Sequence, residues 1–320
     1  MKILVTGGAG YIGSAIVKKL IQKSHAVTVI DSLERGHRRL VDPRAFFMKG
    51  NLLDKPLVKK ALKNHFDGII HCAGYISVSE SVKKPSIYMK NNVQSLLNIV
   101  KNISADVKNN IIFSSSAAVY GNAAKIPITE AAPLRPTSPY GESKLIAEKI
   151  LLSEKKIKSV SLRYFNASGA MPELNCGELH HPETHLIPKA INCAVNNKIF
   201  YLFGNDYDTK DGSCIRDYVH LSDLADAHIL ALEALWQNKR LSHAYNVGSG
   251  EGHSNKEILK TVENITERKL NIKIRPKRAG DPKILIADIS KIKKDLNYSP
   301  RLSKLSKIIK SAYKWRAEQV

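Results

Sequence analysis

The sequence predicts an α/β fold in which a doubly wound parallel sheet carries a second, smaller α/β substrate lobe. Three observations lead to this prediction. A glycine-rich turn joins the first apolar strand to a helix near the N-terminus. Short apolar strands then alternate with segments of helical periodicity up to residue 165. Beyond that point, the alternation gives way to a loop rich in Gly, Pro and His and to a less regular mixture of strands and helices.

The N-terminal segment has the pattern of a dinucleotide-binding βαβ unit. Residues 3–5 form an apolar strand, Ile12, Ile16 and Leu20 repeat at helical spacing, and residues 26–30 form a second strand. Glycines at positions 7, 8, 10 and 13 let the backbone approach a pyrophosphate, which the helix N-terminus attracts. Asp31 ends the second strand eighteen positions after Gly13. A carboxylate there holds the adenosine ribose, so the unit predicts a Rossmann domain that prefers NAD to NADP.

The alternation continues through the rest of the first half. Strands are predicted at 45–48, 68–71, 110–113 and 159–164, and helices at 56–64, 86–101 and 140–152. Loops at the strand ends carry the polar and small residues that could contact a cofactor, namely residues 50–54, 72–74 and 114–116. Such a sequence of strands and helices predicts a parallel sheet with helices on both faces.

The second half is predicted to form the smaller lobe. Its expected strands are 200–204, 215–220 and 270–274. Its expected helices are 186–195, 222–237, one that begins at the capping box of Ser254 and Glu257, and a final helix with Leu305, Ile308, Ile309 and Ala312 on one face. We expect a Rossmann domain over residues 1–165 and a smaller substrate-binding lobe over 166–320, with residues 215–248 packing back on the first domain.

Composition limits the functional classes. The chain has 320 residues, of which 43% are hydrophobic, so it can bury a large core. No apolar run approaches the ~18 residues of a membrane span, and the first strand leaves no room for a signal peptide. Four widely spaced cysteines predict no metal site, no disulfide framework and a cytoplasmic location. The formal net charge of +21 comes from lysines spread along the chain, which favours a solvated surface over a nucleic-acid site.

The candidate chemistry centres on Tyr140 and Lys144, which share one face of a predicted helix because they are four positions apart. A nearby ammonium group lowers the pKa of a phenol, and the positive charge of NAD⁺ acts in the same direction. Tyr140 could then serve as a base near neutral pH. Ser116 ends the preceding strand and could hydrogen-bond the same substrate hydroxyl. We therefore predict Ser116, Tyr140 and Lys144 as the catalytic set.

Seven segments spread over nearly the whole chain together resemble the extended short-chain dehydrogenase/reductase family, and within it the nucleotide-sugar 4-epimerases. They are residues 5–13, 113–121, 138–144, 162–166, 203–207, 216–220 and 280–282. The resemblance implies an NAD-dependent 4-epimerase that interconverts UDP-glucose and UDP-galactose through a transient 4-keto sugar. It leaves open whether the N-acetylhexosamine pair is also a substrate. Because relatives often dimerise through helices equivalent to 86–101 and 140–152, it also implies a homodimer.

The resemblance further implies which residues contact the two ligands. The expected NAD contacts are Gly7, Gly10, Tyr11, Ile12, Gly13, Asp31, Ser32, Asn51, Leu52, Cys72, Ala73, Gly74, Asn91, Tyr140, Lys144 and Tyr164. The expected UDP-hexose contacts are Ser116, Tyr140, Asn166, His185, Leu186, Tyr201, Phe203, Arg216, Arg278, Asp281 and Leu285. Arg216 and Arg278 would hold the diphosphate, Tyr201 and Phe203 would flank the uracil, and Asp281 would hold the uridine ribose. Leu285 would border the 2-substituent of the sugar.

Two other enzyme classes and one non-catalytic class are alternatives to this interpretation. Sugar-nucleotide 4,6-dehydratases carry an Asp-Glu pair where this chain has Ala117 and Ala118, so the groups for water elimination are missing. A UDP-glucuronate epimerase or decarboxylase remains an alternative, although the sequence identifies no partner for the C6 carboxylate. A non-catalytic NAD-sensing or nucleic-acid-binding protein is suggested only by the charge, and the intact set of Ser116, Tyr140 and Lys144 speaks against it.

Overall fold

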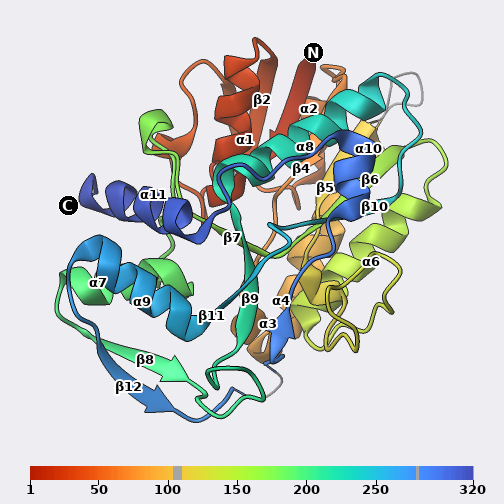
Figure 1. Ribbon diagram of the computed structural model, residues 1–320. Coiled ribbons are helices and arrows are strands. Elements are labelled where there is room, and N and C mark those ends of the chain that lie inside the picture. Colours follow the sequence, from red (N-terminus) through yellow and green to blue (C-terminus); the bar gives the residue numbers. More distant parts are fainter. Residues whose placement is uncertain (104–109, 279–280, 320) are drawn as a thin grey trace.

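The computed structural model describes residues 1–103, 110–278 and 281–319, and its largest element is a seven-stranded parallel sheet (Figure 1). The strand order is β10-β6-β5-β4-β1-β2-β3. The strands are β1 (Lys2–Thr6), β2 (Ala26–Asp31), β3 (Phe46–Lys49), β4 (Gly68–His71), β5 (Asn110–Ser114), β6 (Lys158–Tyr164) and β10 (Ala244–Val247). The predicted doubly wound α/β sheet is therefore confirmed.

Alternating side chains of β1 explain why helices cover both faces of the sheet. Ile3 and Val5 belong to one buried apolar cluster, together with side chains of α1 (Tyr11–Gln22) and α8 (Leu221–Trp236). Leu4 belongs to a second cluster, together with side chains of α2 (Lys55–Leu62), α5 (Ser95–Asn102) and α6 (Pro139–Ser153). Successive residues of a strand point to opposite faces, so a continuous apolar run requires a core on each side.

The order of the strands positions a binding crevice. The chain moves outward from β1 to β2 and β3 and then returns to the other side of β1 with β4. Ligands of open α/β sheets bind beyond the carboxyl ends of the strands at such a switch point. The turn after β1 and residues 72–74 after β4 meet there, because a Cβ at Gly7 would lie 2.6 Å from the backbone nitrogen of Ala73.

The second half builds the smaller lobe and also contributes to the large sheet (Figure 1). One small sheet has the order β11-β9-β13, with β7 also paired to β9, and β12 pairs with β8. These strands are β7 (Asn166–Ser168), β8 (Ile199–Phe203), β9 (Ile215–His220), β11 (Gly252–Ser254), β12 (Asn271–Arg275) and β13 (Ile284–Leu285). The helices are α7 (Leu186–Val195), α9 (Asn255–Thr266), α10 (Ser290–Leu296) and α11 (Leu305–Ala317). Because α7, α9 and α11 share one apolar cluster, they form a separate core.

Three features differ from the sequence-based expectations or were not anticipated. Strand β10 comes from the second half, so the large sheet is not confined to residues 1–165. The single helix expected over 86–101 is composed of α4 (Pro85–Tyr88), a π-helical segment η2 (Met89–Gln94) and α5. A short helix α3 (Val78–Lys83) precedes it, and three 3₁₀ turns lie elsewhere, namely η1 (Arg38–Leu40), η3 (Ala117–Val119) and η4 (Pro172–Leu174). None of the helices in the described part of the chain is long and apolar enough to cross a membrane.

Candidate active site

A cavity of about 1550 Å³ lies at the carboxyl ends of the large sheet and extends to the smaller lobe. It brings together almost every residue predicted for the two ligands. Those from the cofactor set are Gly7, Gly10, Tyr11, Ile12, Gly13, Asp31, Ser32, Asn51, Leu52, Cys72, Ala73, Gly74, Asn91, Tyr140 and Tyr164, and those from the substrate set are Ser116, Asn166, His185, Leu186, Tyr201, Phe203, Arg216, Arg278, Asp281 and Leu285. Lys144 does not line it, because its side chain is buried behind the cavity wall.

The glycine turn forms a cradle that side chains would fill. Gly7 adopts a φ of +71°, which glycine accepts without strain, and it passes close to the backbone of Ala73. At Gly13 a Cβ would lie only 2.1 Å from the carbonyl oxygen of Gly7. Helix α1 begins just after Gly10, which provides no side-chain cap for the first N–H groups. These donors and the helix dipole therefore suit the pyrophosphate of a dinucleotide.

Asp31 is held rigidly at the end of β2. Its carboxylate accepts hydrogen bonds from the backbone N–H groups of Ala9 (3.0 Å) and Leu33 (2.8 Å). Burial raises the pKa of Asp31, and these two hydrogen bonds oppose that rise. Arg35, the nearby cation that could attract a 2′-phosphate, instead donates to both carboxylate oxygens of Glu80 at 3.0 Å and lies over the ring of Tyr75. The local charge therefore favours a free ribose 2′-hydroxyl.

The predicted catalytic side chains converge as the sequence suggested. Tyr140 lies in the first turn of α6 and is 6% exposed, and Ser116 lies near enough to lower the pKa of its phenol group. Lys144 is 2% exposed, and its Nζ donates to the carbonyl oxygen of Ser114 at 2.8 Å. The same Nζ lies 5.9 Å from the centre of the Tyr140 ring. The lysine is thus fixed between the end of β5 and the tyrosine.

The expected lowering of the tyrosine pKa is not found in the protein alone. Burial raises the pKa of Tyr140 above its ordinary value, and the Ser116 hydrogen bond opposes that rise only in part. Burial also lowers the pKa of Lys144 to about 8, so this side chain still carries its charge on most molecules at neutral pH. Burial nevertheless dominates at the phenol. The positive charge of bound NAD⁺ would act in the opposite direction and lower the pKa of Tyr140.

The substrate side of the cavity contains a preformed cationic and aromatic surface. Arg216 on β9 donates to Asp281 at 2.5 Å, and the Arg278 guanidinium lies 4.2 Å from the centre of the Phe203 ring. Asn166 donates from its side chain to the carbonyl oxygen of Asp217 at 2.9 Å. Gly280 of the last sequence motif lies outside the described residues. A planar guanidinium suits a diphosphate because it can donate two parallel hydrogen bonds.

Comparison with known proteins decides the family. The model of the NAD dependent epimerase/dehydratase family matches residues 3–248. The chain belongs to this family. It is 44% identical to a UDP-glucose 4-epimerase of Lactobacillus helveticus, over 98% of this chain and 97% of that protein. Within this family, the expectations of an NAD-dependent epimerase fold and of NAD as the cofactor are confirmed.

Two solved structures of epimerases are similar over nearly their full length. The crystal structure of UDP-glucose 4-epimerase from Brucella ovis in complex with NAD has a TM-score of 0.93 and 39% identity, and covers 98% of this chain and 97% of that one. The UDP-Glc/GlcNAc 4-epimerase of Campylobacter jejuni has a TM-score of 0.85 and 36% identity, and covers 99% of both chains. These relatives share the whole fold, including the smaller lobe.

Asn92, which was not among the predicted site residues, braces the backbone beside the predicted catalytic set. Asn92 is 3% exposed, and its side chain accepts from the backbone N–H of Tyr75 at 2.7 Å. It also donates to the Tyr75 carbonyl oxygen (3.1 Å) and to Ser143 Oγ (3.0 Å). Asn92 therefore ties the loop after β4 to helix α6, whereas Asn91 only borders the cavity.

Sequence reasoning missed two polar residues beside the expected NAD site. Glu34 accepts from the Asn51 side-chain amide at 2.9 Å and from the Tyr75 hydroxyl at 2.7 Å. These contacts link the loops after β2, β3 and β4 across the cavity. No motif marks Glu34 or Tyr75 in the sequence, because their loops meet only in the folded sheet. Asn51, expected near the adenine, makes this contact to Glu34 instead in the protein alone.

Cofactor choice gives a first prediction. We expect NAD, and not NADP, to be released when the purified protein is denatured and its nucleotides are identified by mass spectrometry. The reason is that the fixed Asp31 carboxylate repels a 2′-phosphate while Arg35 is neutralised by Glu80. Arg35→Ala should leave the identity of the cofactor unchanged. Recovery of mainly NADP from the wild type would show that Arg35 dominates over Asp31.

Proposed function

We propose that this chain is a 4-epimerase that interconverts UDP-glucose and UDP-galactose with bound NAD. The observation that carries the proposal is that one cavity unites the dinucleotide turn, the Ser116–Tyr140 pair and the Arg216 and Arg278 guanidinium groups. The names of its relatives supply the substrate class. Together they favour oxidation and reduction at a sugar hydroxyl with the diphosphate anchored at a distance.

The proposed mechanism assigns roles to a few side chains. NAD, when bound, supplies the hydride acceptor and donor for C4 of the hexose. Tyr140 takes the proton of the 4-hydroxyl during oxidation and returns a proton to the 4-keto oxygen after the sugar has turned over. Ser116 hydrogen-bonds the same oxygen, and the Ser114 carbonyl oxygen holds the Lys144 ammonium group near the tyrosine ring. Because the hydride removed from C4 is returned to C4, the reaction is redox-neutral, and its return to the opposite face inverts the configuration.

The anchor must hold while the hexose rotates. Arg216 is 8% exposed and already paired with Asp281, so little freedom is lost when it binds a diphosphate. Arg278 is held on the Phe203 ring. We propose that these two arginines bind the diphosphate, that Tyr201 and Phe203 flank the uracil and that Asp281 contacts the uridine ribose. We propose that fewer charged groups contact the sugar than contact the diphosphate. The sugar can then rotate and present either face.

Incubation of the purified protein with UDP-galactose tests the function. We expect UDP-glucose as the product, identified by NMR, with no net change in NADH absorbance. Parallel incubation with UDP-glucuronate should release no carbon dioxide and form no UDP-galacturonate. Conversion of UDP-glucuronate without conversion of UDP-galactose would replace the proposal by the uronate alternative.

Substrate breadth gives the next prediction and depends on Leu285. This residue lies on β13, pairs in register with Arg216 and lines the cavity. A leucine leaves more room than a tyrosine for an N-acetyl group, and one of the related structures is a UDP-Glc/GlcNAc 4-epimerase. We expect measurable activity on UDP-N-acetylglucosamine, below that on UDP-glucose. In Leu285→Tyr, the activity on UDP-N-acetylglucosamine divided by that on UDP-glucose should be lower than in the wild type.

A neighbouring substitution controls for general effects on β13. Ile286→Val changes the next side chain, which does not line the cavity, and should leave the ratio of activities unaltered. An unchanged ratio in Leu285→Tyr would remove Leu285 as the determinant. Absence of any epimerisation of the acetylated sugar would reject the breadth itself.

We also propose that the chain forms a homodimer. Val82, Ile87 and Leu152 are exposed by 62%, 44% and 56%, and they belong to α3, α4 and α6, which pack against one another. Val82 also lines the cavity, so the exposed side chains offered for association are those of Ile87 and Leu152. Burial of these apolar side chains would favour association. We expect light scattering to give twice the mass of the chain, and we expect Leu152→Lys to weaken the association. A wild-type mass equal to that of a single chain would exclude the dimer.

A further inference from the structure

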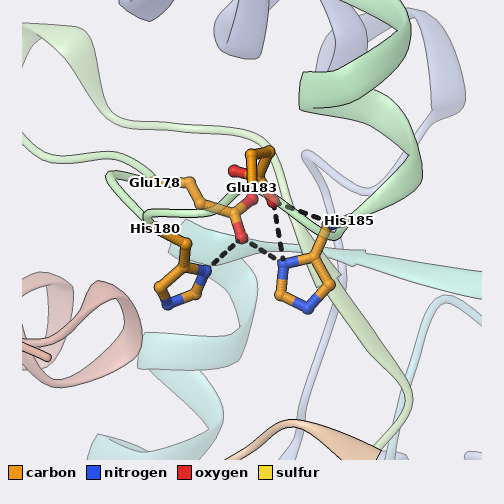
Figure 2. Close-up of side chains that lie close together, drawn as sticks. All are labelled: Glu178, His180, Glu183 and His185. Atoms are coloured by element: carbon orange, nitrogen blue, oxygen red, sulfur yellow. Dashed lines mark hydrogen bonds and ion pairs between the residues drawn. The ribbon is translucent and has the colours of Figure 1, made fainter. Parts of the chain in front are cut away.

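Four potential metal ligands meet in the loop between η4 and α7, outside the groups assigned to hydride and proton transfer. Within residues 1–103, 110–278 and 281–319, Glu178, His180, Glu183 and His185 form the one group whose ligand atoms all lie within 4.8 Å of one another. Figure 2 shows the two imidazole rings on either side of the Glu178 carboxylate, with Glu183 beside His185. These four residues are called the Glu/His cluster below.

Both histidines of the cluster contact the same carboxylate oxygen of Glu178. Oε1 of Glu178 contacts Nδ1 of His180 at 2.7 Å and also contacts Nδ1 of His185 (Figure 2). Oε1 of Glu183 lies 3.8 Å from the same His185 nitrogen. A tetrahedral ion with ligands at about 2.0–2.1 Å needs ligand atoms about 3.3 Å apart. The ligand atoms of the cluster all lie within 4.8 Å of one another, a range that includes this spacing. Side-chain shifts alone would therefore accommodate the ion.

Surrounding contacts hold the ligands in place. The Glu178 side chain is 7% exposed, and its backbone carbonyl accepts from Trp315 Nε1 on α11 at 3.0 Å. Oε1 of Glu183 accepts from the backbone N–H groups of Thr184 and His185, at 2.7 and 2.8 Å. The His180 ring packs edge-on against Tyr11 of α1. Such outer contacts orient ligands before the ion arrives and thereby strengthen binding.

Charge and access also suit a cation. Two carboxylates lie side by side in the cluster, and one of them is almost fully buried, so a positive charge between them is stabilising. His185 is 46% exposed, which gives an ion a route from solvent to the centre. Neutral imidazole nitrogens and carboxylate oxygens together favour zinc and its first-row neighbours over magnesium or calcium.

We propose that the Glu/His cluster binds one divalent transition-metal ion, with Zn²⁺ as the first candidate and Glu178, His180, Glu183 and His185 as its ligands. Four protein ligands fill a tetrahedral shell, so the site is structural and leaves no open position for chemistry. His180 and His185 are separated by four residues, which is within the spacing common in zinc sites. The sequence-based expectation of no metal considered only cysteine patterns and therefore passed over this segment.

The ion would have a definite structural effect. His185 is the residue immediately before α7, and both His185 and Leu186 border the cavity. Glu178 is tied to α11, and His180 packs against α1 of the Rossmann domain. Bound metal would therefore fix the start of α7 relative to both lobes. Because His185 is also one of the expected UDP-hexose contacts, the ion would fix the position of that residue at the edge of the cavity, whereas proton and hydride transfer use none of its ligands.

Metal binding by the wild-type protein is the direct test. The full chain, purified with its NAD and without a polyhistidine tag, is dialysed first against a chelator and then against metal-free buffer. Zn²⁺ is added, unbound ion is removed by gel filtration, and metal is counted by mass spectrometry. We expect about one Zn²⁺ per chain, a higher melting temperature with metal than without, and visible absorption typical of tetrahedral coordination when Co²⁺ replaces Zn²⁺.

Substitution of single proposed ligands tests whether the ion binds at the Glu/His cluster. His180→Gln and Glu178→Gln should each lower the Zn²⁺ affinity at least about tenfold and weaken the Co²⁺ bands. His181→Gln alters the adjacent histidine, which is not part of the cluster, and should bind as the wild type does. Failure of the wild type to retain metal, or equal binding by His180→Gln and His181→Gln, would overturn the proposal. The wild-type measurement decides the matter even where a variant does not fold.

Discussion

Replacing Tyr140 by phenylalanine is expected to lower epimerase turnover by roughly 10²–10⁴, the usual contribution of a general acid–base group. Tyr140 is 6% exposed and lies near Ser116, and removal of its phenolic oxygen leaves the 4-hydroxyl without its proposed proton acceptor. The change deletes one oxygen atom and adds no volume, and the glycine turn and Asp31 remain intact. NAD should therefore stay bound, which nucleotide release on denaturation measures together with the rate on UDP-galactose.

A tyrosine outside the cavity provides the matched control. Tyr313 lies on α11, where it packs against the core of the smaller lobe and does not line the cavity. Tyr313→Phe should keep wild-type turnover. If Tyr140→Phe also kept wild-type turnover, another group would have to move the proton and the proposed mechanism would be wrong.

Replacing Gly13 by alanine is expected to abolish stable retention of NAD. The added Cβ would lie 2.1 Å from the Gly7 carbonyl oxygen and 2.9 Å from Gly8 Cα, so the backbone of the turn must move. Overpacking of this kind costs about 1–3 kcal/mol or more, and here the displaced atoms are those that approach the pyrophosphate. The measurement is the NAD content of the purified variant, with its melting temperature taken in the absence of added nucleotide.

Gly10→Ala separates the closeness of packing from the mere loss of a glycine. At Gly10 a Cβ would meet only the Gly7 carbonyl oxygen, at 3.3 Å, and the φ of −82° suits any residue. This variant should fold with nearly the wild-type melting temperature, and it should lose less NAD than Gly13→Ala. Equal NAD content in Gly13→Ala and the wild type would show that the turn can relax, contrary to the geometry described above.

The sequence alone determined the N-terminal βαβ unit and its cofactor turn. Glycines 7, 10 and 13, the apolar residues 3–5 and Asp31 lie within thirty-one consecutive residues, so local spacing is enough to predict the βαβ unit. The pair of Tyr140 and Lys144 was likewise predictable, because a separation of four on a helix fixes a common face. These predictions rest on backbone periodicity, which tertiary packing did not alter.

Tertiary structure alone decided the details that depend on side-chain direction. Neighbours on a helix point about 100° apart, and the π-helical segment shifts these directions further, so only packing selected Asn92 over Asn91. Burial, which a sequence does not state, raised the pKa of Tyr140 against the expected effect of Lys144. Strand β10 joins the large sheet next to β6, although residues 165–243 separate the two strands, a pairing that no local pattern encodes.

The Glu/His cluster and the Arg216–Asp281 pair are two further features that sequence patterns alone do not predict. Glu178 and His185 lie seven residues apart in a segment without regular spacing, and only the folded loop turns both side chains toward one point. Arg216 and Asp281 are sixty-five positions apart and meet because β13 pairs with β9. Sequence spacing reports contacts made within one helix or one turn. Contacts between segments that are distant in the sequence depend on tertiary packing. These contacts became visible only in the three-dimensional structure.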